Sequence, residues 1–187
     1  MEMVPQAARF SSEVTPAGYR ITIPARRNWF VILFLFAWLG GWVFGELSAS
    51  GQLMRGAEKT PATFLVFWLV AWTVGGFFAT ATLLWQLAGR EVITIDTGSL
   101  SYRAEVLGLG RTRSFRASDV KNLRSTEYAS LPFNSQRGWY PPVFGPGTGP
   151  VAFDYGARTF RIAPSLDEAE ASLLVRELST RLPGATP

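Results

Sequence analysis

The side chains that could do chemistry in this chain are carboxylates, hydroxyls and arginines, because the sequence contains no His and no Cys. This composition excludes thiol catalysis, disulfides, imidazole acid–base catalysis and the usual zinc sites. The acids Asp119, Glu127 and Asp154 could approach one another, but they are also typical of solvated surface acids. We therefore predict a protein that is not an enzyme and binds no cofactor or metal. A membrane enzyme that uses only carboxylates or Ser is the alternative.

Two glycine-rich stretches share only part of a nucleotide-binding motif. The stretch Gly108-Leu109-Gly110 lacks the third glycine and the following helix of a dinucleotide fingerprint, and it predicts a hairpin turn instead. The stretch from Gly145 to Gly149 lacks the Lys-Ser/Thr pair of a phosphate-binding loop. Neither stretch predicts nucleotide binding.

The arginines suggest a different partner, an anionic membrane surface. Residues 90–187 carry 12 basic and 10 acidic side chains, which is too balanced for a nucleic-acid interface. A basic group near an anionic bilayer gains about 1 kcal/mol. Headgroup binding is therefore an alternative function, although the acids Glu91 and Glu105 would reduce the positive electrostatic potential of the arginines. The arginines concerned are Arg103, Arg111, Arg113 and Arg116, with Arg26, Arg27 and Arg90.

Two charge-free apolar runs, 28–45 and 60–89, indicate an integral membrane protein. The first span, 29–47, crosses a hydrocarbon core of ~30 Å at ~1.5 Å per residue. The second, 62–89, is longer than needed and should tilt or extend beyond the membrane. Glu46 lies at the far end of the first span, so a channel or transporter lacks its usual charged residues. The alternatives are buried soluble helices or, for the first run, a signal peptide cleaved after Ser48-Ala49-Ser50.

The distribution of basic residues predicts the topology of this hairpin. Arg26 and Arg27 precede the first span and Arg90 follows the second, so both termini are expected in the cytoplasm. Trp29 and Trp85 stand where interfacial aromatic residues are expected. The connecting loop, 48–61, carries only two basic residues, Arg55 and Lys59. Their charge is offset by Glu46, just before the loop, and by Glu58 within it.

Small residues recur at one-turn spacing in both spans, a pattern that lets helix backbones approach closely. We expect the two helices to pack on each other there, with a homo-oligomer or a contact with another membrane protein as the alternative. The residues are Gly41 and Gly45 in the first span, and Gly75 with Ala79, or Gly76 with Thr80, in the second.

After the second span the pattern changes to the two-residue period of β-strands. A C-terminal helix is predicted to start at a Ser165–Glu168 capping box and to end at Pro183-Gly184. One face of this helix is apolar and carries Leu166, Ala169, Leu173, Leu174, Leu178 and Leu182. The alternation from Tyr19 to Ile23 could add an edge strand from the N-terminal segment. The predicted strands and hairpins lie at 92–95, 100–109, 112–116, 120–126, 151–155 and 159–162.

The order of these elements resembles the bacterial pleckstrin-homology-like domains of small two-span membrane proteins of unknown function. The resemblance covers about residues 89–183 and rests on the stretches GREVITIDTGSL, SYRAEVLGLGRTRSFRASDVKNLR and VAFDYGARTFRIAP. It implies an antiparallel, partly open barrel closed by the C-terminal helix. The expected fold is therefore membrane α+β, with a cytoplasmic segment at 1–28, the hairpin, and a PH-like domain at 90–187.

The stretch 134–150 is the most unusual part of the polar region. It places Trp139, Tyr140 and Phe144 among prolines and glycines, and aromatic residues on a stiff loop lose little entropy on binding. We expect either a loop that docks onto a partner protein or the bilayer, or one whose aromatics fold back onto the sheet.

Taken together, these features predict a non-enzymatic inner-membrane protein. Its hairpin would anchor an interaction domain that serves as a scaffold or accessory subunit of a larger complex, in contact with membrane lipids and with a membrane protein partner or a second copy of itself. No nucleic-acid partner is expected. The alternative function is an anionic-lipid headgroup-binding module at the cytoplasmic leaflet.

Overall fold

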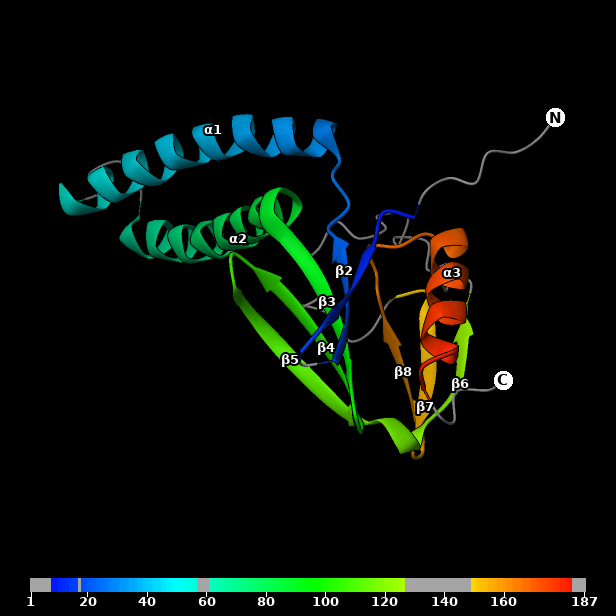
Figure 1. Ribbon diagram of the computed structural model, residues 1–187. Helices are drawn as coiled ribbons and strands as arrows, with labels where there is room; N and C mark the ends of the chain where they lie inside the picture. The colour runs from blue at the N-terminus through cyan, green and yellow to red at the C-terminus, as the bar shows by residue number, and fades with distance from the viewer. Residues whose placement is uncertain (1–7, 17, 57–60, 127–148, 183–187) are drawn as a thin grey trace. The chain divides into compact units, whose positions relative to one another are not determined.

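The computed structural model describes residues 8–16, 18–56, 61–126 and 149–182. The chain divides into two compact units (Figure 1). The helix unit is Arg27–Leu87, and the β unit combines Met1–Arg26 with Ala88–Pro187. The segments before and after the helices thus belong to the same unit.

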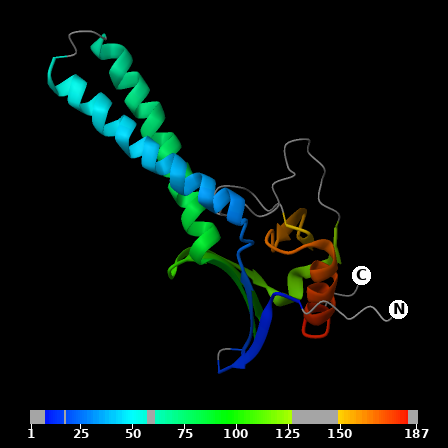
Figure 2. The same cartoon turned by 90° about the horizontal axis from the view of Figure 1, so that it is seen from above.

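The helix unit is an antiparallel pair of long helices, α1 (Trp29–Met54) and α2 (Ala62–Ala88) (Figure 2). Both are long and apolar enough to cross a membrane. The side chain of Asn28 caps α1 by accepting a hydrogen bond from the Val31 N–H at 3.3 Å. The helix α1 extends beyond the predicted end at residue 47 because Ser48 and Ala49 are compatible with a helix. It stops just before Gly56, whose φ is +92°.

The first sheet of the β unit has five antiparallel strands in the order β1-β2-β3-β4-β5. A strand at 19–23 was expected at the edge, but β2 lies inside the sheet and β1 forms the edge. Sequence alternation could not reveal β1, because its residues are nearly all exposed. The strands are β1 (Ser11–Thr15), β2 (Gly18–Pro24), β3 (Gly89–Asp96), β4 (Ser99–Val106) and β5 (Leu109–Arg116).

The second sheet has three antiparallel strands, β6 (Val120–Ser125), β7 (Val151–Tyr155) and β8 (Arg158–Ile162). A single 3-10 turn, η1 (Ala117–Asp119), connects it to the first sheet. The antiparallel strands are confirmed, and they form two separate sheets because the chain turns at Ala117–Asp119.

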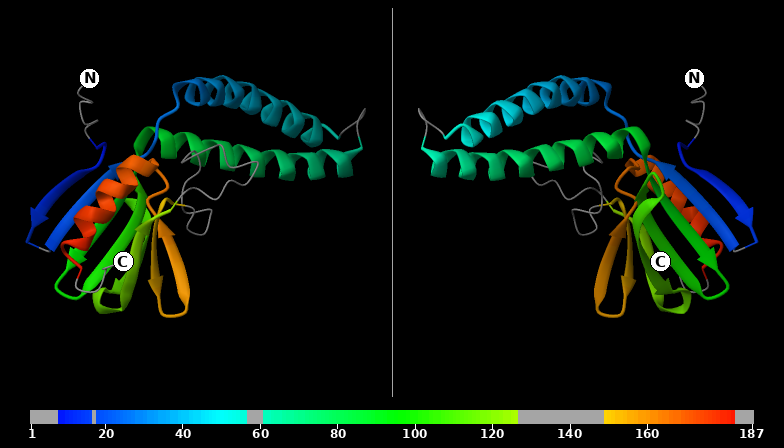
Figure 3. Two further views of the ribbon diagram at one scale, coloured as in Figure 1. Left: turned by 90° about the vertical axis from the view of Figure 1, so that its right-hand side faces the viewer. Right: turned by 90° about the vertical axis from the view of Figure 1, so that its left-hand side faces the viewer.

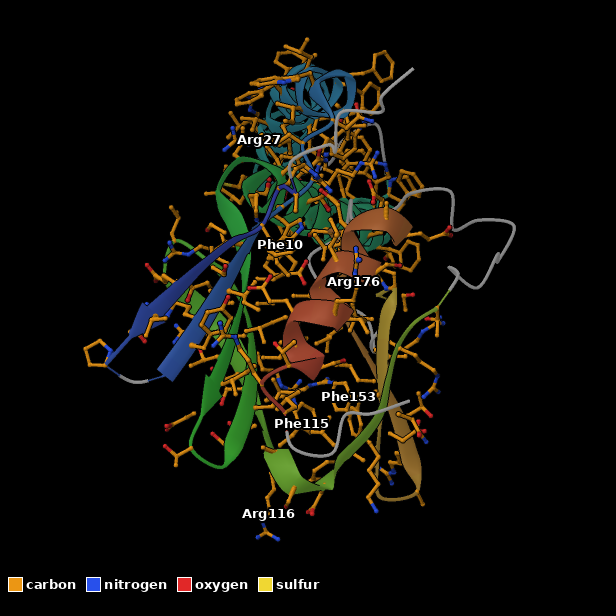
Figure 4. All side chains as sticks on the ribbon, turned by 45° about the vertical axis from the view of Figure 1, so that its right-hand side comes forward. Phe10, Arg27, Phe115, Arg116, Phe153 and Arg176 are labelled. Carbon is orange, nitrogen blue, oxygen red and sulfur yellow. The ribbon has the colours of Figure 1, made fainter. Side chains whose placement is uncertain are left out.

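Aromatic side chains pack the two sheets together. Phe115 of β5 makes edge-to-face contacts with Phe153 of β7 at 5.0 Å and with Phe160 of β8 at 4.9 Å between ring centroids. Phe115 and Phe153 lie next to each other in the interior (Figure 4). Such pairs contribute about 0.5–1.5 kcal/mol beyond the burial of their surface.

The C-terminal helix α3 (Glu168–Ser179) spans the opening between the two sheets (Figure 3). Towards the first sheet, Glu177 accepts a hydrogen bond from the Tyr19 hydroxyl, and the Arg181 guanidinium lies 3.5 Å from the centre of the Tyr19 ring. Towards the second, the Ser172 hydroxyl donates to that of Ser125 at 3.2 Å. Through these side-chain contacts, α3 bridges β2 of the first sheet and β6 of the second.

The start of α3 differs from the prediction. Asp167 is the N-cap and forms a capping box with Glu170, two residues later than the expected Ser165–Glu168 pair. Ser165 is buried, and its N–H donates to Glu91 instead. The helix also ends at Ser179, before the expected stop at residues 183–184, which lie outside the described range.

The shift changes which residues α3 buries. The buried residues of α3 are Glu170, Ala171, Leu174 and Leu178, with Leu166 and Leu182 buried on either side of the helix. Ala169 is exposed and Leu173 only half-buried, contrary to the expected face. Both residues stand on the flank of the helix that turns away from the sheets.

Candidate functional site

Large apolar side chains cover the outside of the helix unit. Within the described chain, aromatic and aliphatic residues stand exposed along the whole length of α1 and α2, which is the reverse of a soluble helix pair. An exposed apolar surface of this extent marks a membrane or protein interface. Examples are Phe30, Phe34, Phe44, Phe64, Phe67 and Phe77.

A reciprocal pair of hydrogen bonds connects the two helices. The Trp42 indole donates to the Trp72 carbonyl oxygen at 3.0 Å, and the Trp72 indole donates to the Trp42 carbonyl oxygen at 3.3 Å. Each bond satisfies a polar ring nitrogen on a helix that otherwise carries almost no polar groups. These tryptophans were not predicted as a pair, because their positions in the sequence give no sign that they face each other.

Glu46 lies close to this pair and well inside α1. Its Oε1 accepts a hydrogen bond from the Thr73 hydroxyl of α2 at 2.8 Å. Its Oε2 is buried, with no hydrogen-bond partner among the residues that the structure describes. The sequence analysis placed Glu46 at the end of the first span, but α1 continues to Met54, so this carboxylate is a polar group within the apolar pair.

Only some of the predicted small residues lie at the contact between α1 and α2. Gly45 faces the Trp72 ring, and a side chain at Gly76 would collide with the Trp42 ring. Among the described residues, a side chain at Gly41 or Gly75 would meet nothing within 4 Å. Ala79 is half-buried. The tryptophan rings thus occupy the space that close backbone packing would have filled, and Gly41 and Gly75 are left on the outside.

The predicted membrane-surface residues differ in exposure. Trp29 is 64% exposed, as an interfacial residue should be, whereas Trp85 is fully buried. Arg26, Arg27 and Arg90 are exposed. Where α1 begins and α2 ends, the Arg27 side chain donates a hydrogen bond to the Leu87 carbonyl oxygen at 3.2 Å.

Gln86 is a residue that sequence reasoning missed at this same end. It is fully buried, and its Oε1 accepts a hydrogen bond from the Asn28 backbone N–H at 2.9 Å. A lone Gln at the end of an apolar run gave no signal of this role. The bond joins the start of α1 to the end of α2.

The outer face of the five-stranded sheet carries a charge cluster around Glu105. The Glu105 carboxylate accepts from Arg90 Nε at 2.5 Å and pairs with Arg103 Nε at 2.7 Å, although its own side chain is only 8% exposed. The cluster lines a shallow hollow of about 360 Å³ together with residues such as Arg20 and Thr112. One carboxylate shared by two arginines leaves a net positive charge here.

The expected arginine cluster is divided between the two faces of the sheet. Strand alternation puts Arg111 and Arg113 on the face of β5 that also carries the buried Phe115. Arg103 and Arg116 stand on the opposite face, and Arg116 pairs with Asp119 at 3.7 Å. The arginines of β4 and β5 therefore form two smaller basic regions, one on each face of the sheet.

A second hollow, of about 630 Å³, lies beside the three-stranded sheet and contains two of the expected acids, Asp119 and Asp154. Asp154 accepts hydrogen bonds from Thr159 at 2.7 Å, Asn122 at 2.9 Å and Arg124 at 3.2 Å. These bonds lower the pKa of Asp154 to about 2. A carboxylate so fully satisfied is a structural anion rather than a general base.

Of the acids that the structure describes, Glu91 of β3 is the most buried, and its side chain points into the core of the β unit. Its Oε2 accepts from the Tyr102 hydroxyl at 2.8 Å and its Oε1 from the Ser165 N–H at 3.1 Å. Burial raises the pKa of Glu91, and burial next to Glu91 raises the pKa of Tyr102 well above its usual value. The pair holds the turn before α3 in place.

The remaining acidic residues do not form a metal centre in the described part of the chain. No group of three or more acidic, His or Cys side chains that could hold a metal ion occurs there. The expected docking loop with Trp139, Tyr140 and Phe144, and the acid Glu127, lie outside the described residues. Comparisons with protein-family models, with curated proteins and with solved structures give no match for this chain.

Proposed function

We propose that the chain is a two-pass protein of a bacterial inner membrane, whose helix hairpin anchors a PH-like β unit. The hairpin serves as the membrane-embedded part of an accessory subunit or scaffold, and the protein is not an enzyme. The exposed apolar shell of α1 and α2 supports the anchoring role. Two sheets bridged by a C-terminal helix support the PH-like architecture.

The observation that carries the partner role is the open space beside Gly41 and Gly75. Because the tryptophans fill the contact between α1 and α2, these glycines contact no other side chain in the described part of the chain. Small residues on the lipid-facing side of a helix allow a further helix to approach closely. The partner is therefore another membrane-spanning helix, from a different protein or a second copy.

The test is extraction from native membranes in a mild detergent, followed by mass spectrometry of what remains bound. Gly41→Leu should lose the bound protein, because it fills the open space without touching the Trp42–Trp72 bonds. Val74→Leu is the control, since it enlarges an already exposed side chain on α2. Equal recovery of the partner with Gly41→Leu and wild type would refute the proposed contact.

Membrane topology can be tested separately because the chain contains no Cys. A membrane-impermeant maleimide should label Gln52→Cys on intact spheroplasts and Thr97→Cys only after permeabilisation. The positive-inside distribution of Arg26, Arg27 and Arg90 supports this orientation. Labelling of both sites on intact spheroplasts would refute it.

Anionic-headgroup binding is the second candidate function, and the exposed Arg111 and Arg113 on β5 favour it. It predicts that phosphatidylglycerol is retained after extraction and that retention falls as salt screens the arginines. Retention that does not depend on salt would count against it.

A further inference from the structure

The turn between β4 and β5 exposes two leucines to solvent. Leu107 is 76% exposed and Leu109 is 82% exposed. The two leucines follow one another across Gly108 at the tip of the hairpin. At these exposures, most of their apolar surface is not buried by the described part of the β unit.

The backbone at this tip conflicts with the choice of leucine. Leu107 has φ +52° and Gly108 has φ +84°, as in a two-residue turn that strongly favours Asn-Gly. Leucine is uncommon in the left-handed region because its Cβ crowds the backbone. A residue that breaks the local rule while remaining exposed is expected where function requires its side chain.

The register of the sheet locates this tip at the end where the chain arrives from α2. Val106, the last residue of β4, pairs with Gly89, and Gly89 directly follows the last residue of α2. The Ala25 N–H donates to the Gly89 carbonyl oxygen at 3.0 Å, four positions before α1 begins. The leucines therefore lie at the same end of the sheet as both connections to the helices.

Basic side chains flank the leucines. Arg103 Nη2 donates to the Gly108 carbonyl oxygen at 2.6 Å and so holds its positive charge against the turn. Arg111 is exposed on the following strand, and Arg90 shares Glu105 with Arg103. An apolar tip with arginines behind it matches the interface of an anionic bilayer, where leucines enter the acyl boundary and arginines meet phosphates.

We propose that the β4–β5 tip, Leu107 to Leu109, inserts into the anionic membrane surface and gives the protein a membrane contact in addition to its helix hairpin. This inference rests on the proposed membrane anchoring of α1 and α2. The ligand is the phospholipid interface itself. The contact fixes the β unit against the bilayer at one end of its first sheet.

The test uses the full chain in vesicles of phosphatidylcholine and phosphatidylglycerol, with single cysteines carrying an environment-sensitive fluorophore. Leu107→Cys and Leu109→Cys report on the tip. Thr97→Cys, in the β3–β4 turn at the opposite end of the sheet, is the matched control. Phe67→Cys, on the exposed surface of α2, reports on anchoring.

Fluorophores at Leu107→Cys and Leu109→Cys should be blue-shifted and quenched by lipids with a nitroxide near the headgroup, while the fluorophore at Thr97→Cys stays unquenched. If Phe67→Cys is quenched by a deep nitroxide and both tip positions behave like Thr97→Cys, the inference is overturned and the anchor stands. If Phe67→Cys is not quenched at any depth, the proposed anchoring fails and the inference fails with it.

Discussion

Replacing Glu91 should change how the stability of the β unit depends on pH. The Glu91 carboxyl is fully buried and its pKa is raised, chiefly by burial, so the unfolded chain ionises first as the pH rises. The contribution of Glu91 to the free energy of unfolding should therefore be fully present below about pH 4.5, the ordinary value for Glu, and should be lost as the pH rises towards the folded pKa. Each unit of upward shift corresponds to about 1.4 kcal/mol lost at high pH.

Two substitutions separate the charge from the hydrogen bonds. Glu91→Gln keeps an oxygen for the Ser165 N–H and can donate to the Tyr102 hydroxyl, so it should remove the fall in stability and be at least as stable as wild type at pH 8. Glu91→Leu leaves the Ser165 N–H and the Tyr102 hydroxyl buried without this partner. At about 1–3 kcal/mol for each group, it should be less stable than Glu91→Gln by about 2–6 kcal/mol.

Pulse proteolysis in urea, on the full chain in detergent micelles at pH 5 and pH 8, would measure these differences. Glu13→Gln is the control, since Glu13 is exposed and its 3.7 Å pair with Arg20 should contribute at most about 1 kcal/mol. A Glu91→Gln variant that retains the wild-type fall between the two pH values would refute the assignment to Glu91. Equal stability of Glu91→Leu and Glu91→Gln would refute the role of the two hydrogen bonds.

Three further predictions concern the helix contact, the acid range and the hairpin tip. Gly76→Val should destabilise the helix pair by about 1–3 kcal/mol, because its side chain collides with the Trp42 ring, whereas Gly75→Val, in open space, should change it by less than about 0.5 kcal/mol in thermal unfolding in detergent. The ionised Asp154 carboxylate should stabilise the fold above pH 3.8, and this stabilisation should be lost as the pH falls through about 2. Acid titration of the wild type should therefore show a loss of stability in that range that Asp154→Asn lacks. Leu107→Asn should stabilise the β4–β5 turn by about 1 kcal/mol in urea unfolding, since Asn suits its positive φ, and should weaken binding of the tip to anionic vesicles; destabilisation would show that Leu107 packs within the fold.

The helices and most strands could be predicted because their signals are local. Charge-free runs of this length and the two-residue alternation around Ile93 and Ile162 depend on neighbouring residues alone. The edge strand β1 has no such pattern, because both of its faces are exposed and only pairing with β2 defines it. Its existence depends on a partner strand, which the sequence of β1 does not encode.

The start of α3 shows how tertiary contacts choose between local signals. Ser165–Glu168 and Asp167–Glu170 are overlapping capping-box patterns of almost equal quality. The buried Glu91, 74 residues earlier, accepts the Ser165 N–H, so Ser165 belongs to the turn and Asp167 becomes the cap. The contacts between α1 and α2 likewise depend on tertiary structure. The pairs Glu46–Thr73 and Trp42–Trp72 form between the two helices, so the sequence of either helix alone does not predict them.

The helix hairpin stands where a turn between β2 and β3 would normally be. These strands pair along their length, from Tyr19 with Ile95 to Pro24 with Arg90, and β2 supplies the fully buried Ile21 and Ile23. A fragment starting at residue 90 should therefore stay unfolded, because β3 loses its neighbour and the core loses two isoleucines, at about 1.5–3 kcal/mol for each. Joining residue 26 to residue 88 through Asn-Gly, in place of 27–87, keeps β2 beside β3 and should give a folded domain. Amide dispersion in NMR spectra of the two variants would decide the matter, and a well-folded 90–187 fragment would show that β1 and β2 are dispensable.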